Sequence, residues 1–275
     1  MHPRHLLQQY NLRPKKGLGQ NFLVDEGALR RIVAAADLTG SDTVLEIGPG
    51  LGALTKLLAE AAGRVVAVEL DDRLIPLLDS ELAGTTNVEV IEGDILQLDP
   101  SALIGTRYKV VANLPYYITA PILRHLLEAR TRPDLMVLTV QQEVAERLTA
   151  KPGKMSVLAV SVQYYGRVRQ VARLKAGSFF PRPEVNSAVV RVDVHQDAPA
   201  STPERRRFFR VVKAGFSQKR KQLRNSIRAG LGIPADQAVA ALEAAGIDPR
   251  RRAETLSLEE WAALAGIPSL FQAGE

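Results

Sequence analysis

The sequence predicts an α/β domain, in which a parallel sheet is covered by helices on both faces, followed by a smaller domain made only of helices. Between residues 43 and 194, short apolar stretches rich in valine alternate with stretches of helical spacing. Such alternation is typical of a parallel sheet with helices on both of its faces. From Glu204 onward the spacing is helical throughout, and Pro234, Pro249 and several glycines interrupt it. This second pattern is typical of a small helical domain.

The elements of the first domain follow one another with short connections. Residues 13–22 are basic and contain glycines, which predicts a loop. Asp25 is predicted to cap a helix over residues 26–36. The stretch 157–164 is apolar and fits either a strand or a helix that Ser156 would cap. The remaining spacing predicts strands at 43–47, 64–69, 88–91, 109–112, 135–140, 168–174 and 187–194, and helices at 53–61, 73–82, 121–129 and 143–148.

A change of composition marks the domain boundary. Residues 195–203 are rich in Asp, Pro, Ala, Ser and Thr, which is typical of a linker. We therefore place the first domain at residues 1–195 and the helical domain at residues 204–275. A chain of this length can bury a substantial core without disulfides or metal ions.

Composition excludes several classes of chemistry. The 275 residues include no cysteine, so disulfides, thiolate catalysis and thiolate metal sites are excluded, and we predict no metal site. Residues 1–10 lack the apolar core of a signal peptide, and no stretch approaches the roughly 20 apolar residues that span a membrane. We expect a cytoplasmic protein without membrane contact. The formal net charge of +6 and the pI near 9.6 favour a polyanionic partner.

The first candidate site is a glycine turn. The predicted strand 43–47 runs into Gly48, Gly50 and Gly52, and a helix follows. Glycine lets the backbone turn sharply and lets a ligand approach closely, and the N-terminus of the helix offers free N–H groups. Because Ala53 completes the relaxed dinucleotide pattern, the turn alone fits NAD as well as S-adenosylmethionine.

Two acids follow the next two predicted strands. Glu69 ends the second strand and Asp94 follows the third. A carboxylate at Glu69 can accept hydrogen bonds from both hydroxyls of a ribose, and Asp94 can accept one from an adenine amino group. Since the carboxyl ends of neighbouring parallel strands meet at one edge, we expect Gly48, Glu69 and Asp94 to converge on one nucleoside.

The second candidate site is Asn113-Leu114-Pro115-Tyr116, which ends the fourth strand at the same edge. An aromatic amine is a poor nucleophile because its lone pair is delocalised into the ring. The Asn113 side-chain carbonyl and a backbone carbonyl beside Pro115 could accept its N–H groups and favour sp³ geometry, while Tyr116 stacks on the base. Phe179, in a proline-rich segment, could form the second wall of an adenine sandwich. The alternatives are a strand-ending turn and a core phenylalanine.

These motifs together resemble the ribosomal small-subunit (16S) rRNA adenine N6,N6-dimethyltransferases, and more broadly the rRNA adenine N6-methyltransferases. The similarity covers nearly the whole chain, with several motifs in the same order. The resemblance is carried by residues 19–23, 46–52, 69, 93–94, 113–116, 179–185 and 214–223.

The resemblance implies a Rossmann-like, S-adenosylmethionine-dependent methyltransferase domain and a helical RNA-binding domain. It implies that the cofactor contacts Asn21, Leu23, Gly48, Glu69, Asp94 and Asn113. It implies that Asn113 and Tyr116 in the catalytic segment hold the target adenine while Phe179 stacks on it. The implied substrate is a pair of adjacent adenosines in a 3′-terminal hairpin loop of small-subunit rRNA, presented on an immature 30S subunit. Each would receive two methyl groups, as part of small-subunit biogenesis, and we expect the enzyme to act as a monomer.

Positive charge concentrates in the helical domain. Residues 204–228 contain ten basic residues and one acid, Glu204. Clusters of this kind bind phosphates, although a solvated helix face is the alternative. Basic residues near the first candidate site add to the charge. The predicted RNA-binding residues are Lys15, Lys16, Arg210, Lys219, Arg220, Lys221 and Arg224.

Three other functions fit parts of the sequence. A large-subunit rRNA methyltransferase of the resistance type would share the catalytic domain, although the helical domain resembles the small-subunit type more. A non-catalytic ribosome-assembly factor would not need the intact segment 113–116. An NAD-dependent dehydrogenase would have no use for that segment or for the basic helix.

Overall fold

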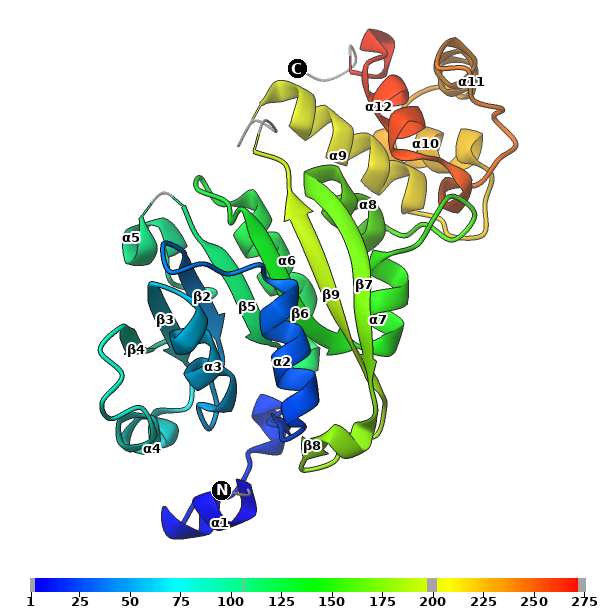
Figure 1. Cartoon of the computed structure of the whole chain (residues 1–275). Coiled ribbons are helices and arrows are strands. Elements are labelled where there is room, and N and C mark those ends of the chain that lie inside the picture. The colour runs from blue at the N-terminus through cyan, green and yellow to red at the C-terminus, as the bar shows by residue number, and fades with distance from the viewer. Residues whose placement is uncertain (1–2, 106, 197–201, 272–275) are drawn as a thin grey trace. The chain divides into compact units, whose positions relative to one another are not determined.

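The computed structural model describes residues 3–105, 107–196 and 202–271, so most of the predicted linker lies outside the described residues. Within that part of the chain, the main sheet has seven strands in the order β4-β3-β2-β5-β6-β9-β7 (Figure 1). The strands from β4 to β6 are parallel, which confirms the predicted α/β fold; the prediction of a parallel sheet holds for these five strands. The strands are β2 (Thr43–Ile47), β3 (Arg64–Glu69), β4 (Val88–Glu92), β5 (Lys109–Asn113), β6 (Leu135–Gln141), β7 (Gly166–Leu174) and β9 (Ser187–Val194).

The last two strands of the sheet run antiparallel to their neighbours. β9 pairs with both β6 and β7, and the β7 pairing shifts register between Gln170 and Ala172. No crossover helix joins β7 to β9, and only a crossover would allow parallel pairing. The connection holds a short strand, β8 (Phe179–Phe180), which pairs with β1 (Phe22–Leu23). The sheet is therefore mixed.

Helices cover both faces of this sheet. In Figure 1, α2 lies in front of the strands and α6 behind them. Valines at alternate strand positions, including Val44, Val65 and Val111, pack against Ile32 of α2 and Leu58 of α3. The helices of this region are α1 (Pro3–Gln9), α2 (Glu26–Ala35), α3 (Ala53–Ala61), α4 (Ile75–Glu81), α5 (Pro100–Ile104), α6 (Thr119–Glu128) and α7 (Gln142–Leu148), with 3-10 turns η1 (Lys16–Leu18), η2 (Asp72–Leu74), η3 (Tyr116–Ile118) and η4 (Ala176–Ser178).

Two predicted caps are confirmed. Asp25 accepts the N–H of Ala28 at 2.9 Å at the start of α2. Ser156 accepts the N–H of Ala159 at 3.2 Å, and residues Val157–Tyr165 form helix α8. Of the two structures that the apolar stretch 157–164 fitted, the helix is therefore the one that forms.

The chain divides into two compact units, and the division differs from the predicted boundary. The first unit contains residues 1–145 and 166–196, and the second contains residues 146–165 and 197–275. Helix α8 belongs to the second unit because its buried Ala159 and Val160 share a core with Phe208, Ile227 and other residues of the C-terminal helices. These helices are α9 (Pro203–Phe216), α10 (Leu223–Leu231), α11 (Ala235–Ala244) and α12 (Leu258–Ala265), with turns η5 (Ala253–Thr255) and η6 (Pro268–Leu270).

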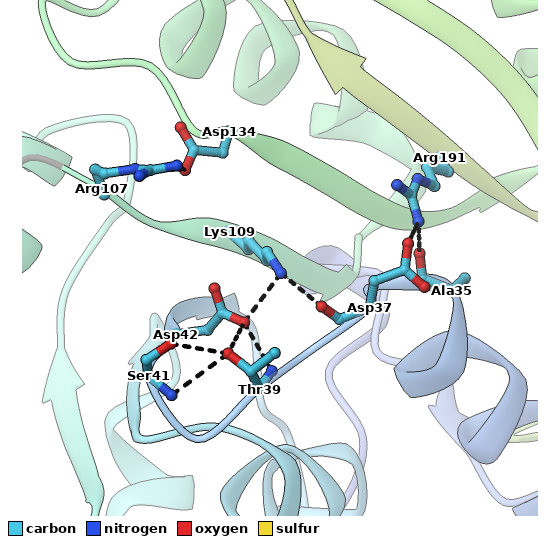
Figure 2. Close-up of polar contacts among 9 residues, drawn as sticks. All are labelled: Ala35, Asp37, Thr39, Ser41, Asp42, Arg107, Lys109, Asp134 and Arg191. Atoms are coloured by element: carbon cyan, nitrogen blue, oxygen red, sulfur yellow. Dashed lines mark hydrogen bonds and ion pairs between the residues drawn. The ribbon is translucent and has the colours of Figure 1, made fainter.

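A polar network fixes the connection between α2 and β2, at the amino end of the parallel strands (Figure 2). The ammonium group of Lys109 donates to the backbone carbonyl of Asp37 at 2.7 Å and to Asp42 Oδ2 at 3.0 Å. Asp37, which has a positive φ of 46°, also pairs with Arg191 of β9. The hydrogen bond and ion pair hold the pKa of Asp37 below its usual range. The network therefore connects this loop to two strands of the sheet.

Among the described helices, none is both long enough and apolar enough to cross a membrane.

Candidate active site

A cavity of about 510 Å³ opens at the carboxyl ends of the parallel strands in the first unit. The ends of β2, β3, β4 and β5 all contribute to its wall, as expected for a ligand crevice in a doubly wound sheet. The predicted residues Gly48, Glu69, Asp94 and Asn113 all line it. So do five others that the sequence singled out: Asn21, Leu23, Leu114, Pro115 and Tyr116.

The glycine turn forms the floor of this cavity. Gly48 and Gly50 both adopt the left-handed conformation, with φ values of 67° and 61°. A Cβ built on Gly50 would lie 2.9 Å from Cδ1 of Phe22, whereas one built on Gly48 would meet no atom within 4 Å. Gly50 therefore allows close packing against β1, and Gly48 leaves open space for a ligand.

Glu69 is buried at the end of β3 with both of its carboxylate oxygens engaged. The N–H of Gly50 donates to Oε2 at 3.1 Å, and the N–H of Asp71 donates to Oε1 at 2.9 Å. Burial raises the pKa of Glu69, and these two backbone donors partly oppose that rise. Each oxygen has two lone pairs, so the carboxylate can still accept two hydroxyl groups from a ligand.

Asp94 follows β4 and is held by its own turn. Its Oδ1 accepts the N–H of Leu96 at 2.9 Å. Within the described residues, Oδ2 has no hydrogen-bond partner and remains available to an amino group. Asp94 and Glu69 can thus contact the two ends of one nucleoside.

Glu46, on β2, is an acid of the cavity wall that sequence reasoning did not select as a site residue. It is 1% exposed, and among the described residues its Oε2 has no hydrogen-bond partner. Burial raises the pKa of Glu46 to about 8, and the nearby Glu69 adds to the rise. Two buried carboxyl groups therefore face one cavity, which favours a cationic ligand. The signal in the sequence was an acid inside an otherwise apolar strand.

Asn113 is held by the N-terminal loop. Its Nδ2 donates to the backbone carbonyl of Asn21 at 3.0 Å, and Asn21 Nδ2 donates to the carbonyl of Gly19, also at 3.0 Å. The NH₂ group of the Asn113 amide is therefore turned toward Asn21. The amide carbonyl oxygen is left to accept an N–H of a substrate. This geometry suits the role predicted for Asn113.

The two predicted aromatic walls differ in their placement. Tyr116 lines the cavity, and its hydroxyl hydrogen-bonds to Ser187 Oγ at 2.7 Å, which fixes the position of the hydroxyl end of the side chain. Phe179 is buried in the sheet core beside Leu23 and Leu174 and is not among the cavity residues. Its stacking role remains a prediction. The exposed aromatic ring at the cavity rim is instead Tyr117, which the sequence analysis did not select.

The predicted RNA-binding residues fall into three groups. Lys15 and Lys16 are both exposed, but the ammonium group of Lys15 forms an ion pair with the buried carboxylate of Asp71. Arg210 lies over the ring of Phe271, 5.8 Å from its centroid. Within the described part of the second unit, the other predicted residues are exposed and form no ion pair, in contrast to Arg250 and Arg251. These free cations are Lys219, Arg220, Lys221 and Arg224.

Comparison with protein families identifies relatives along nearly the whole chain. The model of the family described as ribosomal RNA adenine dimethylase matches residues 11–267. Ribosomal RNA small subunit methyltransferase A of Dehalococcoides mccartyi is 46% identical over 260 residues, which cover 94% of this chain and 89% of the relative. The protein of the same name from Pelotomaculum thermopropionicum is 47% identical over 277 residues, with 95% and 94% covered.

Two solved structures share the fold. A dimethyladenosine transferase from Plasmodium falciparum superposes with a TM-score of 0.77 at 27% identity, covering 88% of this chain and 95% of its own. The 23S rRNA methyltransferase ErmE superposes with a TM-score of 0.74 at 30% identity, covering 89% of this chain and 98% of its own.

Proposed function

The chain belongs to the ribosomal RNA adenine dimethylase family, and from this membership we propose how its residues carry out the reaction. It is an S-adenosylmethionine-dependent rRNA adenine N6,N6-dimethyltransferase of the small-subunit type. Relatives named for the small subunit share 46–47% of their residues with it, whereas the large-subunit enzyme ErmE shares 30%. These values support the small-subunit assignment over the resistance type.

The observation that carries the proposal is the convergence of four strand ends on one cavity. Glu69 would hold the ribose hydroxyls, and Asp94 would hold the adenine amino group of the cofactor. Gly48 gives the backbone close access to the ligand, while Asn21 and Leu23 line the N-terminal side. The unpartnered carboxyl of Glu46 supports a cationic cofactor in this cavity. When bound, S-adenosylmethionine supplies an electrophilic methyl group on a positively charged sulfur.

On the substrate side, Asn113 would orient the target amine. Its free side-chain carbonyl would accept one N–H of N6, and a backbone carbonyl beside Pro115 would accept the other. Both contacts turn the nitrogen lone pair toward the methyl donor, so that positioning supplies most of the acceleration. Leu114 keeps this segment anchored because its side chain is buried. Tyr116, held by Ser187, would stack on the flipped base.

The finer description of the substrate is also part of the proposal. The target is a pair of adjacent adenosines in a 3′-terminal hairpin loop of 16S rRNA, carried by an immature 30S subunit, and the enzyme acts as a monomer. Lys16, Lys219, Arg220, Lys221 and Arg224 would bind the phosphates of that RNA. Their exposure without ion pairs supports this role.

Methyl transfer to two substrates tests the proposal. Labelled S-adenosylmethionine is supplied with purified immature 30S subunits and, in parallel, with protein-free large-subunit rRNA, and the product nucleoside is identified. We expect N6,N6-dimethyladenosine only in the 30S sample. Label in the large-subunit RNA would favour the resistance type, and label in neither would favour a binding factor without this activity.

A further inference from the structure

Asp71 lies two residues after Glu69, and its carboxylate accepts four side-chain hydrogen bonds. Its side chain is 0% exposed, yet it is surrounded by donors. Oδ1 accepts from Lys15 Nζ at 2.9 Å and from Arg73 Nε at 2.8 Å. Oδ2 accepts from Gln20 Nε2 at 2.8 Å and from Arg73 Nη2 at 2.7 Å. Arg73 is a local partner, whereas Lys15 and Gln20 come from a loop more than fifty residues away.

The loop that Asp71 holds spans both halves of the active site. At its other end, the carbonyl of Asn21 accepts the side-chain amide of Asn113 at 3.0 Å. Between these points, a Cβ built on Gly19 would lie 3.3 Å from Tyr117 and 3.5 Å from Pro115. The segment 15–21 therefore runs from the side of the cavity where the cofactor ribose would bind to the side where the target adenine would bind.

Asp71 also contacts Glu69, the residue proposed to bind the ribose, through its backbone N–H. Its own N–H donates to Oε1 of Glu69 at 2.9 Å. A shift of Asp71 would therefore move both the loop and the carboxylate that would hold the cofactor. The donors of Arg73, Lys15 and Gln20 keep the pKa of Asp71 below its usual range, so the group is ionised at neutral pH.

We propose that Asp71 is a positioning residue that ties the loop 15–21 over the cofactor cavity and aligns Glu69. This inference rests on the proposed function, because it assumes that the cavity holds S-adenosylmethionine. It also assigns Lys15 a second role, since its ammonium group serves as a tether in addition to any contact with RNA. Without the tether, the loop occupies its binding-competent position for only a fraction of the time, and the apparent affinity for the cofactor is multiplied by that fraction.

The principal test is the Asp71→Asn variant. The new amide keeps one acceptor oxygen, but its NH₂ group would face the donors that Lys15, Gln20 and Arg73 now direct at the carboxylate. We expect the dissociation constant for S-adenosylmethionine, measured by calorimetry, to rise about tenfold or more, as for a loop in place a tenth of the time. The rate at saturating cofactor should change less. Asp72→Asn is the matched control, because that exposed carboxylate accepts only the N–H of Arg73.

A second variant approaches the tether from the loop side. Lys15→Met combined with Gln20→Ala leaves Asp71 its pairing with Arg73, so the carboxylate stays partnered. We expect this double variant to weaken cofactor binding as Asp71→Asn does, with the free energy of unfolding measured for both. Wild-type affinity in either variant, or a loss explained entirely by the unfolded fraction, would overturn the proposal.

Limited trypsin cleavage separates this inference from the proposed function. The Lys16–Gly17 bond lies within the tethered loop, and we expect both variants to be cut there faster than the wild type in the absence of cofactor. Unchanged cleavage would overturn the tether. If the wild-type protein failed to bind S-adenosylmethionine, the proposed cofactor site would be wrong, and the cleavage rates would still decide whether Asp71 holds the loop.

Discussion

The side-chain amide of Asn113 donates to the backbone carbonyl of Asn21 across 92 residues of sequence, at 3.0 Å. This contact joins the end of β5 to the N-terminal loop and leaves the amide carbonyl of Asn113 free. The orientation of one side chain therefore depends on two distant segments. The proposed roles of Asn113 toward the cofactor and the substrate would both depend on this contact.

The Asn113→Ala variant should lose methyl transfer while keeping most of its cofactor affinity. The substitution removes the acceptor that orients the target amine, and loss of one such preorganised contact costs about a hundredfold or more in kcat. Methylation of 30S subunits and calorimetry with S-adenosylmethionine measure the two effects. Asn87→Ala is the control, because Asn87 donates to the carbonyls of Ala59 and Ala62 and does not line the cavity. Full activity in Asn113→Ala would show that the substrate site lies elsewhere.

The buried carboxyl of Glu46 should make stability depend on pH. Burial raises its pKa from 4.5, the usual value of an unburied carboxyl, to about 8 in the folded protein. Between these values the unfolded chain releases the proton while the folded chain keeps it, so the free energy of unfolding falls as pH rises. The loss is at most about 1.4 kcal/mol per pH unit.

Glu46→Gln removes that proton linkage but retains the shape of the side chain. We expect the variant to gain stability relative to the wild type from pH 5 to pH 8, as measured by urea denaturation without cofactor. Glu69, whose pKa burial also raises, is present in both proteins, so the part of its proton linkage that burial causes is common to both. A constant difference across this range would mean that Glu46 is ionised in the folded state.

The exposed cations in the turn between α9 and α10 should contribute to RNA affinity. Replacing Lys219, Arg220 and Lys221 together by Gln should weaken binding to 30S subunits and lower the slope of log affinity against log salt by about 2, since each phosphate contact contributes about 0.7–0.9. The control replaces three paired arginines of the first unit, Arg64, Arg107 and Arg124, which removes the same charge. Equal effects of the two triple variants would indicate a general charge effect and not an interface.

The network at the amino end of the sheet should contribute to stability but not to binding. Lys109→Met leaves the Asp42 carboxylate and the Asp37 carbonyl without their shared donor, at a cost of about 1–3 kcal/mol in the free energy of unfolding. Arg107→Met removes an exposed ion pair with Asp134 in the same region (Figure 2), at a cost of about 0–1 kcal/mol. Urea denaturation compares the two. Similar losses would mean that the partly buried network adds little beyond a surface pair.

Much of the cavity could be predicted from sequence because parallel strands place their carboxyl ends at one edge. Knowing the order of the strands was enough to bring Gly48, Glu69 and Asp94 together. The predicted ranges 43–47, 53–61 and 64–69 agree with β2, α3 and β3 in the structure.

Features that depend on distant contacts were not predictable in this way. The opposite direction of β9 depends on which strand it joins, and the place of α8 depends on helices that begin only at Pro203, well after α8 ends at Tyr165. In the sequence, Asp71 and Asp72 look like two equivalent surface acids, but in the structure only Asp71 is buried among cations. Lys15 likewise looked available for RNA, because nothing local indicates its pairing with Asp71.

The interleaving of the two units has a consequence for biosynthesis. The chain enters the second unit at residue 146, returns to the first at 166 and leaves it again after 196. During translation, α8 therefore leaves the ribosome before α9 to α12, the helices that bury its apolar face. At roughly 5–20 residues per second, that face waits for several seconds or more. A new copy of an enzyme that acts on ribosomal RNA thus carries, while still attached to a ribosome, an apolar segment whose packing partners have not yet been made.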